Sequence, residues 1–194
     1  MGGAKEVLSQ GTSIGAIAMI LVTVGTHEQP FDRLVQEMDR LVEDGVIEEE
    51  VFIQTGYTTV VPQHCIHEAF ISFDEMLRKI DQARIIITHG GPGSIMPVLY
   101  RRKIPVVVPR QKAFSEHVDD HQLRFVQMLE RNNRVIAVYD ISGLGGVVKD
   151  YEAKAVRLGY PEQGEAEQDM KIKDFAAKLD ILCREILFSK RAIK

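Results

Sequence analysis

A glycine-rich turn directly after an apolar run is the stretch best suited to chemistry. Residues 85–94 read IIITHGGPGS, with His89, Gly90, Gly91, Gly93 and Ser94 following three isoleucines. Glycine lets main-chain N–H groups approach a ligand closely, because no Cβ holds the ligand away. If a helix follows, its unpaired N–H groups and its dipole favour a bound anion, typically phosphate. A sharp strand-to-helix turn also needs glycine without any ligand, so the pattern alone leaves phosphate binding and a plain turn open. It matches neither the Walker motif nor G-x-G-x-x-G.

Further polar and glycine residues follow other predicted strands in the same way. They are Gly25-Thr26-His27, Ser72-Phe73 and the segment from Arg110 to Gln122. In open parallel sheets, ligands bind beyond the carboxyl ends of the strands. We therefore expect these segments to converge on one site.

The elements that must position these residues alternate along the chain. Continuous apolar runs predict buried strands, and apolar residues at a spacing of three and four predict amphipathic helices. Ser72 is expected to cap a helix that starts at Asp74, and Pro30 is expected in the first turn of the helix before it. We predict strands at 19–24, 51–54, 66–71, 85–87, 104–108 and 134–139, and helices at 28–41, 74–82, after the glycine turn to about 102, and at 118–131.

This alternation predicts an α/β fold, a Rossmann-like, mostly parallel sheet with helices on both faces. We expect residues 1–18 to be a mobile N-terminal extension and residues 19–140 to form the ligand-binding domain. Residues 141–194 are expected to pack back on it through a loop at 143–146 and an amphipathic helix at 172–187.

Length and composition are those of one ordinary globular domain. The chain has 194 residues, 45% of them hydrophobic and 27% charged, with a net charge of −4 that argues against nucleic-acid binding. Cys65 and Cys183 form no metal-binding spacing, and reduced thiols in a cytosolic protein are expected. The apolar stretch at 14–24 is too short to span a bilayer.

Three segments together carry a resemblance to a known family. They are residues 22–34 (VTVGTHEQPFDRL), 88–94 (THGGPGS) and 116–122 (EHVDDHQ). In this order they resemble short bacterial glycosyltransferases that are similar to the C-terminal domain of glycosyltransferase family 28. This group includes small subunits of capsular and exopolysaccharide glycosyltransferases and the catalytic subunit of the dolichol-linked N-acetylglucosaminyltransferase.

The resemblance implies the C-terminal, donor-binding half of a GT-B glycosyltransferase. Its activity would be hexosyl transfer (galactose-, glucose- or N-acetylglucosamine-type) from a UDP-sugar to a polyprenyl-pyrophosphate-linked sugar. It also implies a membrane-associated subunit that binds the lipid-linked acceptor, and hence a cytoplasmic protein held at the inner membrane face through that partner. No cofactor is expected. No Asp-x-Asp pair is present, and adjacent Asp119 and Asp120 point about 100° apart on a helix, so we expect no metal.

The resemblance also implies roles for individual residues. Ser72 and Phe73 would hold the uracil, although Phe73 also suits core packing. Arg110 would stabilise the leaving diphosphate, and a solvated surface arginine is the alternative. Glu116, Asp119 and Gln122 would read the sugar hydroxyls, although acids there also suit a helix start. His27 is the candidate general base, but a phosphate or structural contact is favoured. The full predicted donor-binding set is Gly25, Thr26, Ser72, Phe73, His89, Gly90, Gly91, Gly93, Ser94, Arg110, Glu116, Asp119 and Gln122.

Pro97 departs from the family pattern, which often places a ribose-binding Glu there. Proline in a helix interior removes a hydrogen bond, so we expect this helix to begin late, with Pro97 in its first turn. The departure supports an alternative function, a non-catalytic nucleotide-sugar-binding or interaction subunit. A nucleotide-sugar epimerase or dinucleotide enzyme is a weaker third candidate.

Overall fold

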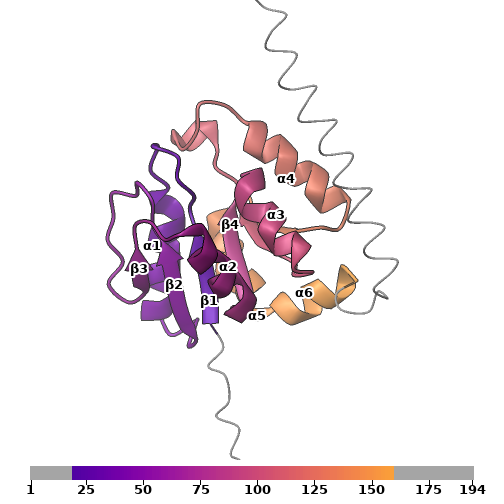
Figure 1. Cartoon of the computed structure of the whole chain (residues 1–194), viewed down its shortest axis with the longest axis horizontal. Coiled ribbons are helices and arrows are strands. Elements are labelled where there is room, and N and C mark those ends of the chain that lie inside the picture. The colour runs from indigo at the N-terminus through magenta and orange to yellow at the C-terminus, as the bar shows by residue number, and fades with distance from the viewer. Residues whose placement is uncertain (1–18, 160–194) are drawn as a thin grey trace, which may run out of the picture.

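A parallel six-stranded sheet forms the centre of the molecule (Figure 1). The computed structural model describes residues 19–159. The strands lie in the order β3-β2-β1-β4-β5-β6, and each neighbouring pair is parallel. The predicted α/β fold is therefore confirmed. The strand bounds are β1 (Met19–Thr23), β2 (Glu50–Gln54), β3 (Ile66–Glu68), β4 (Ile85–His89), β5 (Val106–Val108) and β6 (Ile136–Ala137).

The two central strands, β1 and β4, are buried along their whole length. Their runs of isoleucine, leucine and valine suit strands that are covered on both faces. From β1 the chain proceeds outward to β2 and β3, then returns to β4 on the other side of β1. A ligand crevice forms at such a reversal of strand order, beyond the carboxyl ends of the strands.

Helices cover both faces of the sheet (Figure 1). On one face, α1, α5 and α6 pack against side chains such as Ile20 and Val22 of β1. On the other face, Leu21 and Ile86 pack with α2 and α3, and Val107 packs with α3 and α4. The helices are α1 (Asp32–Glu43), α2 (Phe73–Gln82), α3 (Pro92–Tyr100), α4 (His121–Arg131), α5 (Leu144–Lys149) and α6 (Tyr151–Arg157), with short 3-10 turns η1 (Lys112–Phe114) and η2 (Ile141–Gly143).

Several predicted boundaries differ from the structure. Pro30 lies ahead of α1 rather than in its first turn, because the helix begins at Asp32 after Phe31. The predicted loop at 143–146 is wrong, since Gly145 lies inside α5, where a Cβ would come within 2.8 Å of Leu41. Glycine at position 145 allows α5 to pack closely against α1. Helix α6 was not predicted from the sequence. The proposed extension at 1–18 and the amphipathic segment at 172–187 lie outside the described residues.

The expected late start of the helix after the glycine turn is also wrong. Helix α3 begins at Pro92, and Pro97 lies in its interior. Proline at the first helical position has a suitable φ and lacks an N–H that would be unpaired in any case. A start at Pro92 is therefore favourable, and the helix accommodates the second proline.

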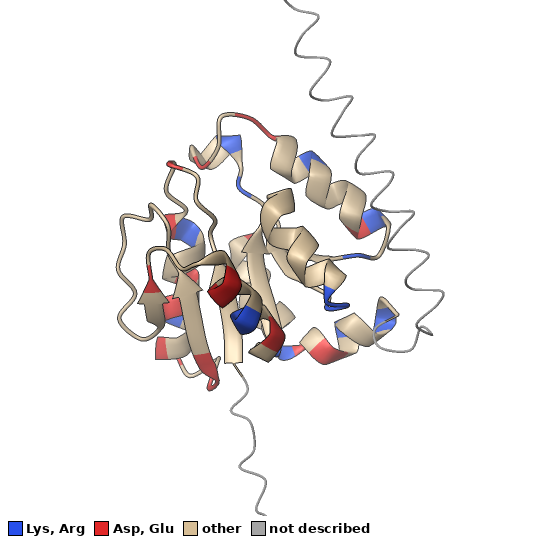
Figure 2. Ribbon diagram, viewed as in Figure 1, with Lys and Arg blue, Asp and Glu red and all other residues tan. Residues whose placement is uncertain are grey.

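The described helices and charged residues show no membrane-spanning or one-sided pattern. Within residues 19–159, none of the helices is both long and apolar enough to cross a bilayer. Acidic and basic residues are interspersed over these same residues (Figure 2).

Candidate functional site

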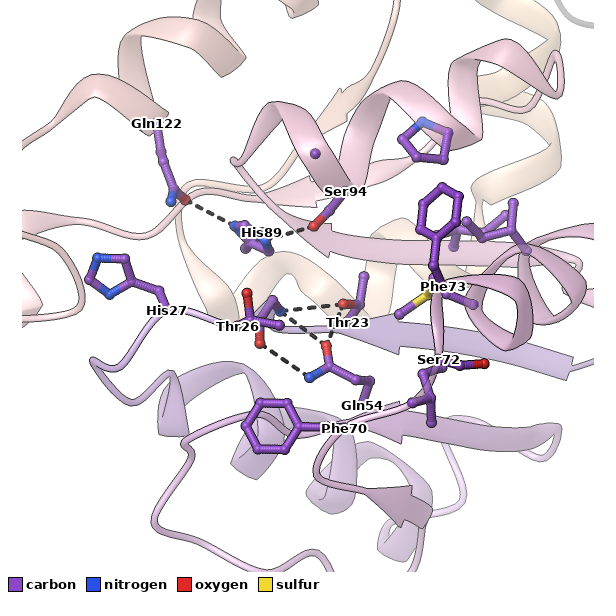
Figure 3. Close-up of a pocket in the computed structure, with 17 residues that line it drawn as sticks. Thr23, Thr26, His27, Gln54, Phe70, Ser72, Phe73, His89, Ser94 and Gln122 are labelled. Atoms are coloured by element: carbon purple, nitrogen blue, oxygen red, sulfur yellow. Dashed lines mark hydrogen bonds between the residues drawn. The ribbon is translucent and has the colours of Figure 1, made fainter.

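A cavity of about 620 Å³ lies at the carboxyl ends of β1 and β4 (Figure 3). This is the position expected for a ligand crevice from the reversal of strand order between β1 and β4. Nine of the predicted site residues line it: Gly25, Thr26, His27, Ser72, Phe73, His89, Gly93, Ser94 and Gln122. The structure thus brings together three of the segments that follow different strands, together with the start of α4.

His89 joins the polar residues on one side of this cavity. Its Nδ1 accepts a hydrogen bond from the Gly91 N–H at 3.1 Å, and its Nε2 lies 2.7 Å from the Ser94 hydroxyl. Burial, followed by the positive charge of Arg110, lowers the pKa of His89 to about 4. The ring is therefore neutral at physiological pH, with Nε2–H donating to Ser94. These two hydrogen bonds hold the turn between β4 and α3 in place.

The glycines around His89 are required mainly by packing. A Cβ on Gly91 would lie 2.2 Å from the His89 ring, and a Cβ on Gly25, which has a φ of +80°, would lie 2.4 Å from it. A Cβ on Gly90 would lie 2.9 Å from the side chain of Gln122. In contrast, a Cβ on Gly93 would meet no described atom within 4 Å. Gly93 is therefore the glycine that leaves room for a ligand at the start of α3.

Gln54 fixes the loop after β1 and was not singled out from the sequence. Its side-chain amide donates to the main-chain oxygens of Gly25 at 3.1 Å and Ala69 at 2.8 Å. Its Oε1 accepts from the Thr23 hydroxyl at 2.7 Å and from the Gly25 N–H at 3.2 Å. The available signal was a polar residue at the end of an otherwise apolar strand, at the edge where the ligand-binding segments gather.

The opposite side of the cavity is apolar. Phe73 and Phe70 are 67% and 49% exposed, and with Met76 and Pro97 they form a wall that a flat ring could contact. Figure 3 shows Phe73 across the cavity from His27. The alternative that Phe73 packs in the core is wrong. Ser72 caps α2 as predicted, since its hydroxyl accepts from the Glu75 N–H at 3.2 Å.

His27 lies at the exposed edge of the cavity. Its Nδ1 accepts from the Gln29 N–H at 3.2 Å, and its ring centre lies 4.9 Å from that of His117. Partial burial, followed by the nearby His117 and Arg110, lowers the pKa of His27. Because Nδ1 accepts from the Gln29 N–H, the proton of the neutral ring lies on Nε2, so His27 can act as a base only if this hydrogen bond is given up.

Arg110, Glu116 and Asp119 do not line the cavity. The alternative of a solvated Arg110 is wrong, because its side chain is fully buried and donates to main-chain carbonyls. The Glu116 carboxylate pairs with Arg33 at 2.8 Å, and Asp119 pairs with His117 and His121. Glu116 and Asp119 precede α4, which begins three residues later than expected, so they lie in a loop and not at a helix start.

The walls of the cavity carry no Asp, Glu, Lys or Arg among the described residues. Over the same part of the chain, no group of three His, Cys, Asp or Glu is placed to hold a metal ion. The Gly93 N–H in the first turn of α3 has no main-chain partner in residues 19–159. An anion at this position would be bound by such N–H groups, by hydroxyls and by the helix dipole.

The cavity thus has a polar end beside a helix N-terminus and an apolar end with exposed aromatic rings. A ligand that fits both carries an anionic group joined to a flat ring, as a nucleotide does.

Comparison with solved structures shows the same fold in glycosyltransferases. The chain is similar to the glycotransferase of kitacinnamycin (TM-score 0.57, 18% identity, 81% of this chain and 41% of that one). It is also similar to SnogD from Streptomyces nogalater (TM-score 0.52, 18% identity, 94% and 48%) and to MurG of Acinetobacter baumannii (TM-score 0.51, 14% identity, 83% and 50%). The matched part is half or less of each of those chains. The predicted fold, the C-terminal half of a GT-B glycosyltransferase, is confirmed.

Sequence comparison points to the same group. Over 72 residues the chain is 29% identical to the UDP-N-acetylglucosamine transferase subunit ALG13 of Yarrowia lipolytica. That match covers 37% of this chain and 35% of that protein. The glycosyltransferase family 28 C-terminal domain matches residues 19–179, which is most of the chain. The chain therefore belongs to the family of glycosyltransferase family 28 C-terminal domains.

Proposed function

We propose that the chain is the donor-binding subunit of a glycosyltransferase that takes a hexose from a UDP-sugar. The observation that carries this proposal is the two-ended cavity, which joins a polar helix N-terminus to an exposed aromatic wall. Family membership and the name of the Yarrowia lipolytica protein, a UDP-N-acetylglucosamine transferase subunit, support the choice of a UDP-sugar.

In this proposal the diphosphate lies at the start of α3, beside Gly93 and Ser94. The uracil lies against Phe73 and the main chain near Ser72, and Gln122 contacts the sugar. As the glycosidic bond to the diphosphate breaks, negative charge grows on the leaving UDP. Main-chain N–H groups and the α3 dipole stabilise that charge, and no metal or other cofactor is required. Gly90 and Gly91 contribute by holding His89 and Gln122 in place rather than by direct contact.

The acceptor in this proposal is a polyprenyl-pyrophosphate-linked sugar bound by a separate membrane-associated subunit. The open side of the cavity, where His27 lies, would face that subunit. The chain would then be cytoplasmic and peripheral to the inner face of the membrane, in capsular or exopolysaccharide synthesis. The general base would come from the partner, with His27 as the alternative within this chain.

Calorimetric titration of the purified chain with UDP, UDP-galactose, UDP-glucose, UDP-N-acetylglucosamine and NAD tests the donor site. We expect the uridine nucleotides to bind and NAD not to bind. Gly93→Leu should abolish binding, because its side chain enters the cavity. Gly146→Leu is the matched control, since Gly146 is also helical and unobstructed but lies in α5 on the other face of the sheet. Binding of UDP that survives Gly93→Leu would place the nucleotide elsewhere.

A second candidate function is a non-catalytic nucleotide-sugar-binding or interaction subunit. The specific observation that favours it is the cavity wall without a charged side chain, together with Pro97 inside α3. A transfer assay with the acceptor-binding subunit present separates the two. Sugar transfer that is lost in Gly93→Leu supports catalysis, and UDP binding without transfer supports the second function.

A further inference from the structure

Arg110 makes an unusual set of contacts for an arginine directly after a strand. Its Nη1 donates to the main-chain oxygens of Gln29 at 2.6 Å, Glu116 at 3.0 Å and Pro30 at 3.3 Å. Its Nη2 donates to the main-chain oxygen of Val24 at 2.9 Å. The guanidinium also lies 4.8 Å from the centre of the Phe31 ring.

These carbonyls bracket one short segment of the cavity wall. Val24 precedes Gly25, and Gln29 and Pro30 follow Glu28, so a single side chain joins the two ends of residues 25–28. Gly25, Thr26 and His27 from this segment line the cavity, whereas Arg110 does not. The contact with the Glu116 carbonyl connects the same segment to the loop before α4.

We propose that Arg110 is a positioning residue, whose guanidinium holds residues 25–28 in the shape that lines the donor cavity without touching the ligand. The expected effect on donor binding rests on the proposed function, whereas the expected effect on the conformation of residues 25–28 does not.

The chemistry of the contacts explains why an arginine is needed. A guanidinium presents several N–H donors in a fixed plane, and a lysine ammonium cannot reach carbonyls on both sides of the segment in this geometry. The Glu116 carboxylate is held by Arg33, at 2.8 and 3.0 Å, so the charge of Arg110 is met mainly by carbonyl dipoles. Burial lowers the pKa of Arg110 to about 10, which leaves it protonated at neutral pH.

Amide hydrogen exchange on the ligand-free full chain tests the positioning role directly. The readouts are the amides of Gly25 and Gln29, which donate to Gln54 Oε1 and to His27 Nδ1, each at 3.2 Å. In Arg110→Gln we expect both amides to exchange faster by on the order of tenfold or more. Arg110→Lys should behave similarly, and it carries the test if Arg110→Gln does not fold. In both variants the Kd for UDP should rise by on the order of tenfold.

Arg84→Gln is the matched control. Arg84 also joins separate parts of the chain, through Glu49 and Glu152, but follows α2 at the amino-terminal end of β4. Its loss should lower stability without changing exchange at Gly25 or Gln29, or the affinity for UDP. Unchanged exchange in the Arg110 variants, or full recovery by Arg110→Lys, would overturn the positioning role. Wild-type protein that does not bind UDP would instead refute the proposed function and leave the exchange test valid.

Discussion

The turn after β4 offers two glycine substitutions, two positions apart in the chain, that should have opposite effects on stability. In Gly91→Ala the new Cβ would lie 2.2 Å from the His89 ring. The ring cannot move without disturbing its hydrogen bonds to the Gly91 N–H and the Ser94 hydroxyl. Overpacking costs about 1–3 kcal/mol, and each lost hydrogen bond costs about 0.5–1.5 kcal/mol. The free energy of unfolding should therefore fall by roughly 2–6 kcal/mol.

Gly93→Ala is the matched control within the same turn. A Cβ at this position meets no described atom within 4 Å, and the residue already has a helical conformation in α3. Alanine is favoured over glycine in helices by up to about 1 kcal/mol, so Gly93→Ala should be neutral or stabilising.

Thermal and urea unfolding of both variants, followed by circular dichroism, measures the difference. For a chain of this length, each kcal/mol corresponds to about 2–4 °C in Tm, so Gly91→Ala should unfold at least about 4 °C below wild type. Equal midpoints for the two variants would show that His89 is not tightly packed between glycines. The His89 ring would then not be what requires glycine at position 91.

Three further predictions concern pH and ligand binding. Burial lowers the pKa of His89 from 6.5 to about 4, so between these pH values the unfolded chain binds a proton on this ring more readily than the folded chain does. The free energy of unfolding should therefore fall by roughly 2 kcal/mol from pH 7 to pH 5, and urea unfolding of His89→Gln should lack this pH dependence. Gln122→Ala should raise the apparent KM for the donor, because Gln122 lines the cavity and its contact with His89 is long, at 3.4 Å. An unchanged KM in transfer assays would show that Gln122 does not contact the donor. Phe73→Ala should weaken UDP binding in calorimetry with little change in Tm, because Phe73 is 67% exposed, and a large drop in Tm would contradict this.

The central part of the fold could be predicted from the sequence because its signals are local. Continuous apolar residues identified β1 and β4, and Ser72 at the start of α2 was identified as its cap. The position of the site followed from strand ends alone, since parallel strands place their carboxyl ends at one edge. These predictions needed no knowledge of long-range contacts.

The parts that could not be predicted depend on contacts between distant residues. The burial of Arg110 depends on carbonyls 80 or more positions away in the chain, at Val24, Gln29 and Pro30. The role of Gln54 depends on its contact with the loop after β1. The helix at 144–149 was missed because local preference disfavours two glycines in a helix, whereas Gly145 is needed for packing against Leu41.

The unequal burial of the two ends of the cavity has a consequence for how the protein can change over evolution. His89 and Gln54 belong to the folded interior, so replacing them alters the stability of the protein together with the polar end of the cavity. Phe70 and Phe73 are largely solvent-exposed and can be exchanged at little cost in folding free energy. Under the proposed function, descendants of this chain could therefore acquire a different base preference through a few substitutions at the aromatic wall, while the polar end of the cavity stays constant.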